Sequence, residues 1–108
     1  MTFDKAALLT PHLGEDKHEI PGFGTVRIRS LSREEALELR SRPDADGSGG
    51  DRWVLARCLL DPVLTEDEVG IWQANSPPME IQAVCDAIRD LSGLGVGAAK
   101  SGVSGVRE

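Results

Sequence analysis

Two copies of one helix-start signal constrain this chain most. Residues 31–35 (LSREE) and 64–69 (LTEDEV) each place Ser or Thr three positions before Glu, with Leu directly ahead. This is the pattern of a capping box with a hydrophobic staple, in which the hydroxyl and the Glu each satisfy a free backbone amide. Breakers follow closely, because residues 43–50 are rich in Gly and Asp, and Asp61-Pro62 disfavours the helical backbone. The chain therefore predicts several short helices.

Four helices are expected, at about residues 32–41, 52–60, 65–75 and 78–92. Asp51 is the expected cap of the second helix, which is apolar on every side except that of Arg57 and should therefore be central. The fourth helix carries one apolar stripe at helical spacing and a natural stop at Gly93. Residues 43–50 are expected to form a flexible polar linker.

Residues 17–30 predict a β-hairpin. Pro21-Gly22 suits the centre of a type II turn, and Val26 and Ile28 alternate with basic residues in the second strand. Because a lone hairpin is marginal in water, its apolar face should pack on the helices. The expected fold class is α+β and mostly α, a small hairpin on a bundle of about four short helices.

The ends of the chain are expected to lie outside this globular domain of residues 17–94. Residues 1–16 are weakly helical from Asp4 to Leu9, and Thr10-Pro11 breaks that helix. Residues 95–108 are rich in Gly and small side chains, which bury too little surface to offset the entropy of ordering, so this tail is expected to be disordered.

Composition narrows the class of partner. The chain has 108 residues and a net charge of -6, which disfavours nucleic acid and anionic lipid surfaces. Its apolar runs are too short to span a bilayer, and its N-terminus lacks the pattern of a signal peptide. Cys58 and Cys85 lie in apolar helical patterns that suit buried free thiols in a reducing compartment. We therefore expect a cytosolic protein whose partner is another protein.

No motif of catalysis or nucleotide binding is complete. Lys100-Ser101 follows several glycines, but Ala99 stands where a phosphate-binding loop requires Gly. His12 and His18 have no motif that places them near a thiol nucleophile. The sequence therefore predicts a protein that is not an enzyme and has no cofactor.

Metal binding is also not expected. Asp44-x-Asp46-x-Ser48-Gly49 matches the first half of a calcium loop, but Leu55 occupies the position of the bidentate Glu. The histidines and cysteines lack zinc-like spacing. A solvated linker is the preferred interpretation of the aspartates.

Five residues are candidates for partner binding. Glu34, Glu35 and Glu38 share one helix side and could dock a basic partner, although an ordinary solvated face is the preferred interpretation. Trp53 and Ile71 are candidates for partly exposed interface groups, since Trp is frequent in binding hot spots, although packing in the core or at its rim is the preferred interpretation for each.

The order of elements resembles the tail assembly chaperones of long-tailed bacteriophages. The resemblance rests on residues 26–35 (VRIRSLSREE), a basic strand running into a capping box, and on 59–69 (LLDPVLTEDEV), a helix broken at Asp-Pro before a second box. It extends through the amphipathic helix that closes in Leu91-Ser92-Gly93-Leu94, and covers about residues 20–94. Each piece is a generic helix signal, and the specificity lies in their order and spacing.

The resemblance implies a function. Such proteins bind the long tape measure protein in the host cell cytoplasm, keep it soluble, and are absent from the mature virion. A longer product, commonly made by ribosomal frameshifting, recruits the major tail tube protein. The resemblance provides no catalytic residue or binding motif to transfer, and self-association is left open. The alternatives are a small cytosolic regulatory or adaptor domain that binds another protein and, less favoured, an accessory subunit of an enzyme.

Overall fold

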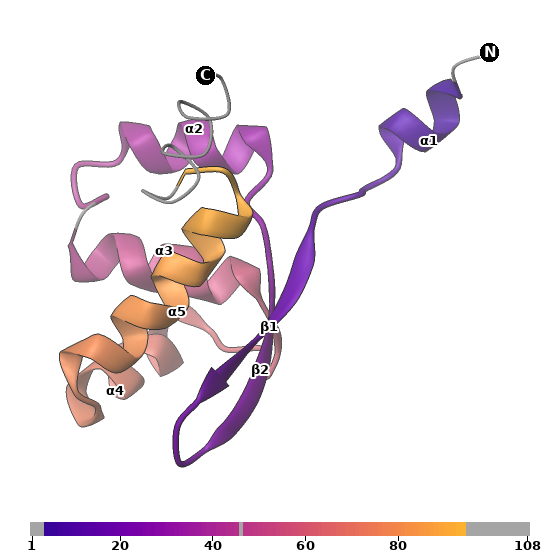
Figure 1. Cartoon of the computed structure of the whole chain (residues 1–108). Coiled ribbons are helices and arrows are strands. Elements are labelled where there is room, and N and C mark those ends of the chain that lie inside the picture. The colour runs from indigo at the N-terminus through magenta and orange to yellow at the C-terminus, as the bar shows by residue number, and fades with distance from the viewer. Residues whose placement is uncertain (1–3, 46, 95–108) are drawn as a thin grey trace, which may run out of the picture.

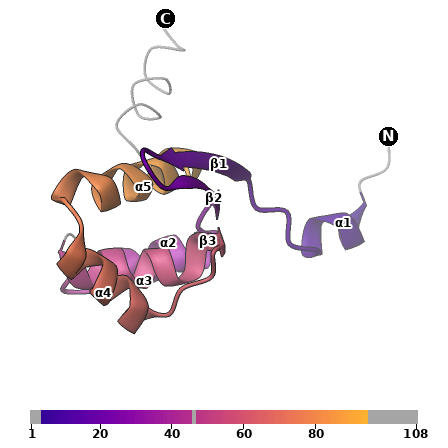
Figure 2. The same ribbon diagram turned by 90° about the horizontal axis from the view of Figure 1, so that it is seen from below.

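The computed structural model describes residues 4–45 and 47–94, which form a three-stranded antiparallel sheet with helices to one side of it (Figure 1). The elements in chain order are α1 (Lys5–Leu9), β1 (Glu15–Ile20), β2 (Gly24–Arg29), α2 (Arg33–Ser41), α3 (Ser48–Cys58), β3 (Leu59–Asp61), α4 (Glu66–Asn75) and α5 (Pro78–Leu91). Figure 2 shows α5 facing α2, α3 and α4 across the core, with the sheet along one end. The expected α+β class, a hairpin with four packed helices, is confirmed.

The hairpin has the expected turn. The amide of Phe23 donates to the carbonyl of Ile20 at 3.0 Å, and Gly22 has a φ of 85°. This left-handed backbone at the third position of a Pro-Gly turn is the reason glycine is needed there. The paired strands run from Glu15 opposite Arg29 to Ile20 opposite Gly24, so the first strand begins two residues earlier than expected.

A third strand, β3, was not predicted. We expected residues 59 and 60 to continue the preceding helix, but that helix ends at Cys58, and β3 pairs antiparallel with β2. Leu59 is buried at 3% exposure, and its partner Ile28 at 1%. A short apolar stretch such as this one is compatible with a buried strand and with a buried helix. The hydrophobic periodicity therefore did not distinguish these two structures.

Both capping boxes are confirmed. At the start of α2, Ser32 Oγ accepts from the Glu35 amide at 3.1 Å, and Glu35 Oε1 accepts from the Ser32 amide at 3.0 Å. At the start of α4, Thr65 and Glu68 make the same exchange at 3.1 and 2.9 Å. Each box satisfies two amides that a helix start otherwise leaves free.

The stop after α5 is also confirmed. Gly93 has a φ of 78°, its amide donates to the Asp90 carbonyl at 3.1 Å, and the Leu94 amide donates to the Arg89 carbonyl at 2.7 Å. These two bonds form a Schellman motif, which requires the left-handed backbone that glycine adopts without strain. The expected tail, residues 95–108, lies outside the described residues.

The expected linker at residues 43–50 and the cap at Asp51 were wrong in part. Helix α3 begins at Ser48, and Asp51 lies within its first turn. The amide of Gly50 donates to the carbonyl of Asp44 at 2.9 Å, and a Cβ on Gly50 would collide with that carbonyl. A Cβ on Gly49 would collide with the Asp44 carboxylate. The glycines thus permit close backbone packing at a helix start, where composition alone indicated flexibility.

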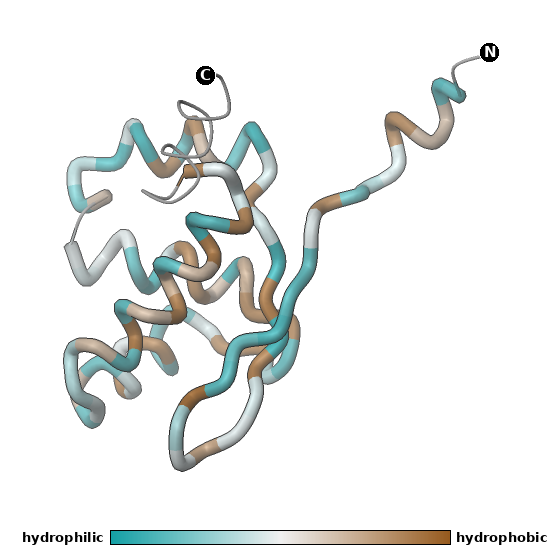
Figure 3. The backbone as a smooth tube through the Cα atoms, viewed as in Figure 1, coloured by the Kyte–Doolittle hydropathy of each residue, from teal (hydrophilic) through white to brown (hydrophobic). Residues whose placement is uncertain are grey.

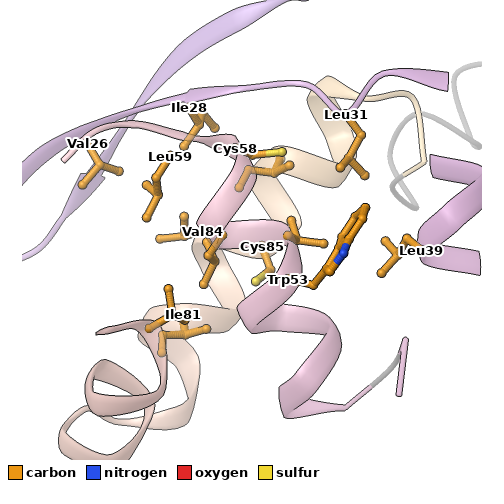
Figure 4. Close-up of a cluster of buried hydrophobic side chains, with 14 of the residues drawn as sticks. Val26, Ile28, Leu31, Leu39, Trp53, Cys58, Leu59, Ile81, Val84 and Cys85 are labelled. Carbon is orange, nitrogen blue, oxygen red and sulfur yellow. The ribbon is translucent and has the colours of Figure 1, made fainter. Parts of the chain in front are cut away.

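The core lies between α3, α5 and the sheet (Figure 4). Helix α3 is central as expected, and α5 buries the apolar stripe that its sequence predicted. The most deeply buried members of these two helices are Trp53, Val54, Leu55, Cys58, Ile81, Val84, Cys85 and Ile88. Both thiols are free and buried, as expected. No helix in the described part of the chain has the length and apolar character needed to cross a bilayer.

Helix α1 stands apart from this body (Figure 1). Asp4 caps it, with Oδ1 accepting from the Ala6 amide at 3.0 Å, and it ends at the expected break, Thr10. None of its residues is buried. Figure 3 shows apolar positions along this projecting arm, which lies away from the other elements.

Candidate functional site

An apolar groove of about 470 Å³ lies beside the tip of the β-hairpin. It is lined by the hairpin tip, by β3 and its connection to α4, and by the end of α4 together with the start of α5. The lining residues are Ile20, Phe23, Gly24, Thr25, Val26, Leu59, Pro62, Leu64, Trp72, Asn75, Ser76 and Glu80. A volume of this size is typical of binding pockets.

Exposed apolar side chains occur among the lining residues of the groove and at positions next to them in the sequence. Phe23 in the hairpin turn is 82% exposed. Val63, 73% exposed, and Met79, 70% exposed, are chain neighbours of lining residues. Apolar surface that is concave and open to solvent, such as the lining of this groove, is where proteins and ligands commonly bind. The groove is therefore the strongest candidate for a protein-binding site.

Two side chains that line the groove, Trp72 and Glu80, form a hydrogen bond with each other. The indole Nε1 of Trp72 donates to Glu80 Oε2 at 2.6 Å, which ties α4 to α5. Ser76 Oγ donates to the Trp72 carbonyl at 2.7 Å. Among the described residues, no Lys or Arg forms an ion pair with Glu80. The groove thus combines an apolar lining with one carboxylate that a partner's basic group could neutralise.

The three candidate glutamates do not act as one face. Glu34 and Glu38 are exposed, but Glu35 is only partly exposed. The Arg29 guanidinium donates to both carboxylate oxygens of Glu35, at 2.8 and 3.0 Å. This contact lowers the pKa of Glu35 to about 2, because hydrogen bonds from Arg29 favour the charged form. Glu35 therefore joins the hairpin to α2, and no α2 residue is among those that line the groove.

The expectation that Trp53 is partly exposed was wrong. It is 2% exposed and points into the core beside Leu31 and Leu39 (Figure 4). Arg57 Cζ lies 4.0 Å from the centroid of its ring, and Arg42 Cζ lies 5.6 Å away. Guanidinium groups stack favourably on indole faces. The indole therefore shares a side with Arg57, as the helical spacing indicated, but Arg42 and Arg57 cover it.

Ile71 is 64% exposed on α4, so its expected outward position is confirmed. Trp72, its neighbour, is partly buried and packs against the core. Whether Ile71 contacts a partner stays a prediction.

Neither cysteine is an activated nucleophile. Burial raises the pKa of the Cys58 thiol to about 11, and burial also raises the pKa of Cys85. Burial raises the pKa of the neighbouring Asp51 carboxyl as well. Thiols held in the protonated form are poor nucleophiles and poor metal ligands.

The aspartate segment is partly engaged by the protein itself. Arg42 donates to both oxygens of the Asp44 carboxylate, at 3.0 and 3.2 Å, and Asp46 lies outside the described residues. Within residues 4–45 and 47–94, no three His, Cys, Asp or Glu side chains cluster as metal ligands.

Comparisons of the chain with protein-family models, with curated proteins and with solved structures found no match. The structure itself is a small α+β domain with an apolar groove beside the hairpin tip.

Sequence reasoning missed the groove. Its walls come from three segments, 20–26, 59–64 and 72–80, that are far apart in the chain. One local signal was present, because Phe23 follows a Pro-Gly turn where a large apolar side chain has no core to enter.

Proposed function

We propose that this chain is a tail assembly chaperone of a long-tailed bacteriophage, and that it holds the tape measure protein through the groove at the hairpin tip. It acts by binding and catalyses no reaction. It works in the host cell cytoplasm and is absent from the mature virion. A longer, frameshifted product recruits the major tail tube protein.

The observation that carries this proposal is the apolar groove with Glu80 in its wall. A tape measure protein is a very long helical chain whose apolar stripes aggregate unless they are covered. An amphipathic helix places apolar side chains at positions i, i+3 and i+4, which fill such a groove, while a flanking Lys or Arg meets the carboxylate. The net charge of -6 supports the same function, because acidic proteins raise the solubility of the complexes they form.

The sequence resemblance identifies the bound protein, here called the client, as the tape measure protein. It covers about residues 20–94, which contain every residue that lines the groove. An adaptor domain of another kind would use the same groove, so the identity of the bound protein distinguishes the two functions.

Coexpression tests the proposal. The tape measure protein encoded by the same genome is expressed alone, with the wild-type chain, and with Phe23→Asp, which places a charge in the groove at an exposed site. The control is Leu37→Asp on α2, where the side chain is 45% exposed and outside the groove. We expect wild type and Leu37→Asp to keep the client soluble and Phe23→Asp to lose most of that effect.

Two results would overturn the proposal. If the client is equally insoluble with and without the wild-type chain, the chaperone function is wrong. If Phe23→Asp protects the client as well as wild type does, the groove is not its binding site. The gene provides a further check, because the frameshifted product requires a slippery heptanucleotide near the codons for residues 97–100 and an overlapping frame.

A further inference from the structure

Helix α1 lacks the packing that a helix of its length requires. It has five residues, and isolated helices shorter than about 12 residues are marginal in water. Leu8 is 52% exposed, Leu9 is 71% exposed, and Leu13 in the connection to β1 is 37% exposed. An arm of this kind becomes stable only when another surface covers its leucines.

The arm is directed away from the groove of its own copy. It leaves β1 at the end opposite the hairpin tip, so α1 and the tip lie at opposite ends of this strand (Figure 1). At the base of the arm, the Gly14 carbonyl accepts from the Ser30 amide at 2.8 Å, which ties the chain to the sheet just before β1. The groove is lined by the opposite end of the hairpin, from Ile20 to Val26. In this arrangement the leucines of the arm are presented to a second molecule.

We propose that two copies of the chain exchange arms, so that α1 of each copy occupies the groove of the other. The leucines of α1 fill the apolar lining, and Lys5 is the basic residue of the arm that can meet Glu80, which has no basic partner among the described residues. Reciprocal exchange closes a two-fold dimer in which each site contains a helix from the second copy.

The exchange uses the groove that the proposed function assigns to the client. The arm then covers the apolar surface of the free chaperone, and a client helix displaces it. The arm exchange requires no client, because it involves only copies of this chain.

Sedimentation equilibrium of the full chain over a range of concentrations tests the exchange. We expect wild type to dimerise, and both Leu8→Asp/Leu9→Asp in the arm and Phe23→Asp in the groove to weaken the dimer by at least about tenfold. Leu37→Asp is the matched control, because it adds a charge at an exposed leucine outside the arm and groove, and it should dimerise as wild type does.

Mixing the two defective variants gives a sharper result. The arm variant retains an intact groove, and the groove variant retains an intact arm, so a mixture can form one of the two contacts. We expect a heterodimer from the mixture under conditions where each variant alone is monomeric. Circular dichroism of each variant checks that the fold is unchanged.

Three results would overturn the exchange: a monomeric wild type at every concentration, an arm variant that dimerises as wild type does, or a mixture that stays monomeric. These failures are distinct from failure of the proposed function, since a monomeric wild type that still keeps its client soluble refutes the exchange alone. A dimer that forms through the arms without protecting any client would refute the chaperone function alone.

Discussion

The Arg29–Glu35 ion pair joins the hairpin to α2, and Glu35→Gln tests how strongly. The substitution removes the charge that accepts two hydrogen bonds from Arg29, at 2.8 and 3.0 Å. Gln retains a side-chain oxygen for the Ser32 amide, so the capping box keeps its backbone contact. The variant therefore isolates the ion pair from the helix cap.

The expected magnitude follows from the pKa of Glu35. A lowering from 4.5 to about 2 corresponds to about 3 kcal/mol of stability at neutral pH. The side chains are 19% and 21% exposed, so screening by water reduces this to about 2 kcal/mol. For a domain of this size, that loss lowers Tm by roughly 8–16 °C.

The effect also depends on pH with a definite sign. Because the folded state lowers the pKa of Glu35, its contribution is complete above the ordinary pKa of 4.5 and is lost as the pH falls towards about 2. The free-energy difference between wild type and Glu35→Gln should therefore be constant near neutral pH and fall to half or less by about pH 3.

Urea unfolding followed by tryptophan fluorescence at several pH values measures this difference. Glu34→Gln is the matched control, because it makes the same charge change in the same first turn at an exposed position. It should cost less than about 0.5 kcal/mol. Equal losses in the two variants at pH 7, or a Glu35→Gln deficit that is as large at pH 3 as at pH 7, would refute the reasoning.

Three further predictions concern the core and the end of α5. Trp53→Ala should lower the free energy of unfolding by about 3–5 kcal/mol in urea titrations, because it empties a buried site covered by guanidinium groups; a loss below 1 kcal/mol would contradict its burial. Gly93→Ala should cost about 1 kcal/mol in the same assay, since the φ of 78° strains any side chain, and an unchanged midpoint would argue against the Schellman motif. Cys58 and Cys85 should resist a thiol reagent at pH 8 in the native protein and react fully in urea, and rapid native labelling of both would contradict their burial and the raised pKa of Cys58, about 11.

The sequence by itself determined the features that depend on a few neighbouring residues. The two capping boxes, the Pro21-Gly22 turn and the Gly93 stop each involve groups within about five positions along the chain, so the residue types present decide the local backbone. The apolar stripe of α5 was equally visible, because helical periodicity alone selects the face that is buried.

The tertiary structure decided the features that depend on which distant segments meet. Residues 59–61 became a strand because β2 offered a free edge, and Glu35 became an ion-pair partner because the hairpin brought Arg29 to it. Trp53 was covered by Arg42, which directly follows α2. The groove arose in the same way, from three separated segments. Burial, pairing and concave surfaces are properties of contacts between elements, and a pattern within one element does not specify its neighbours.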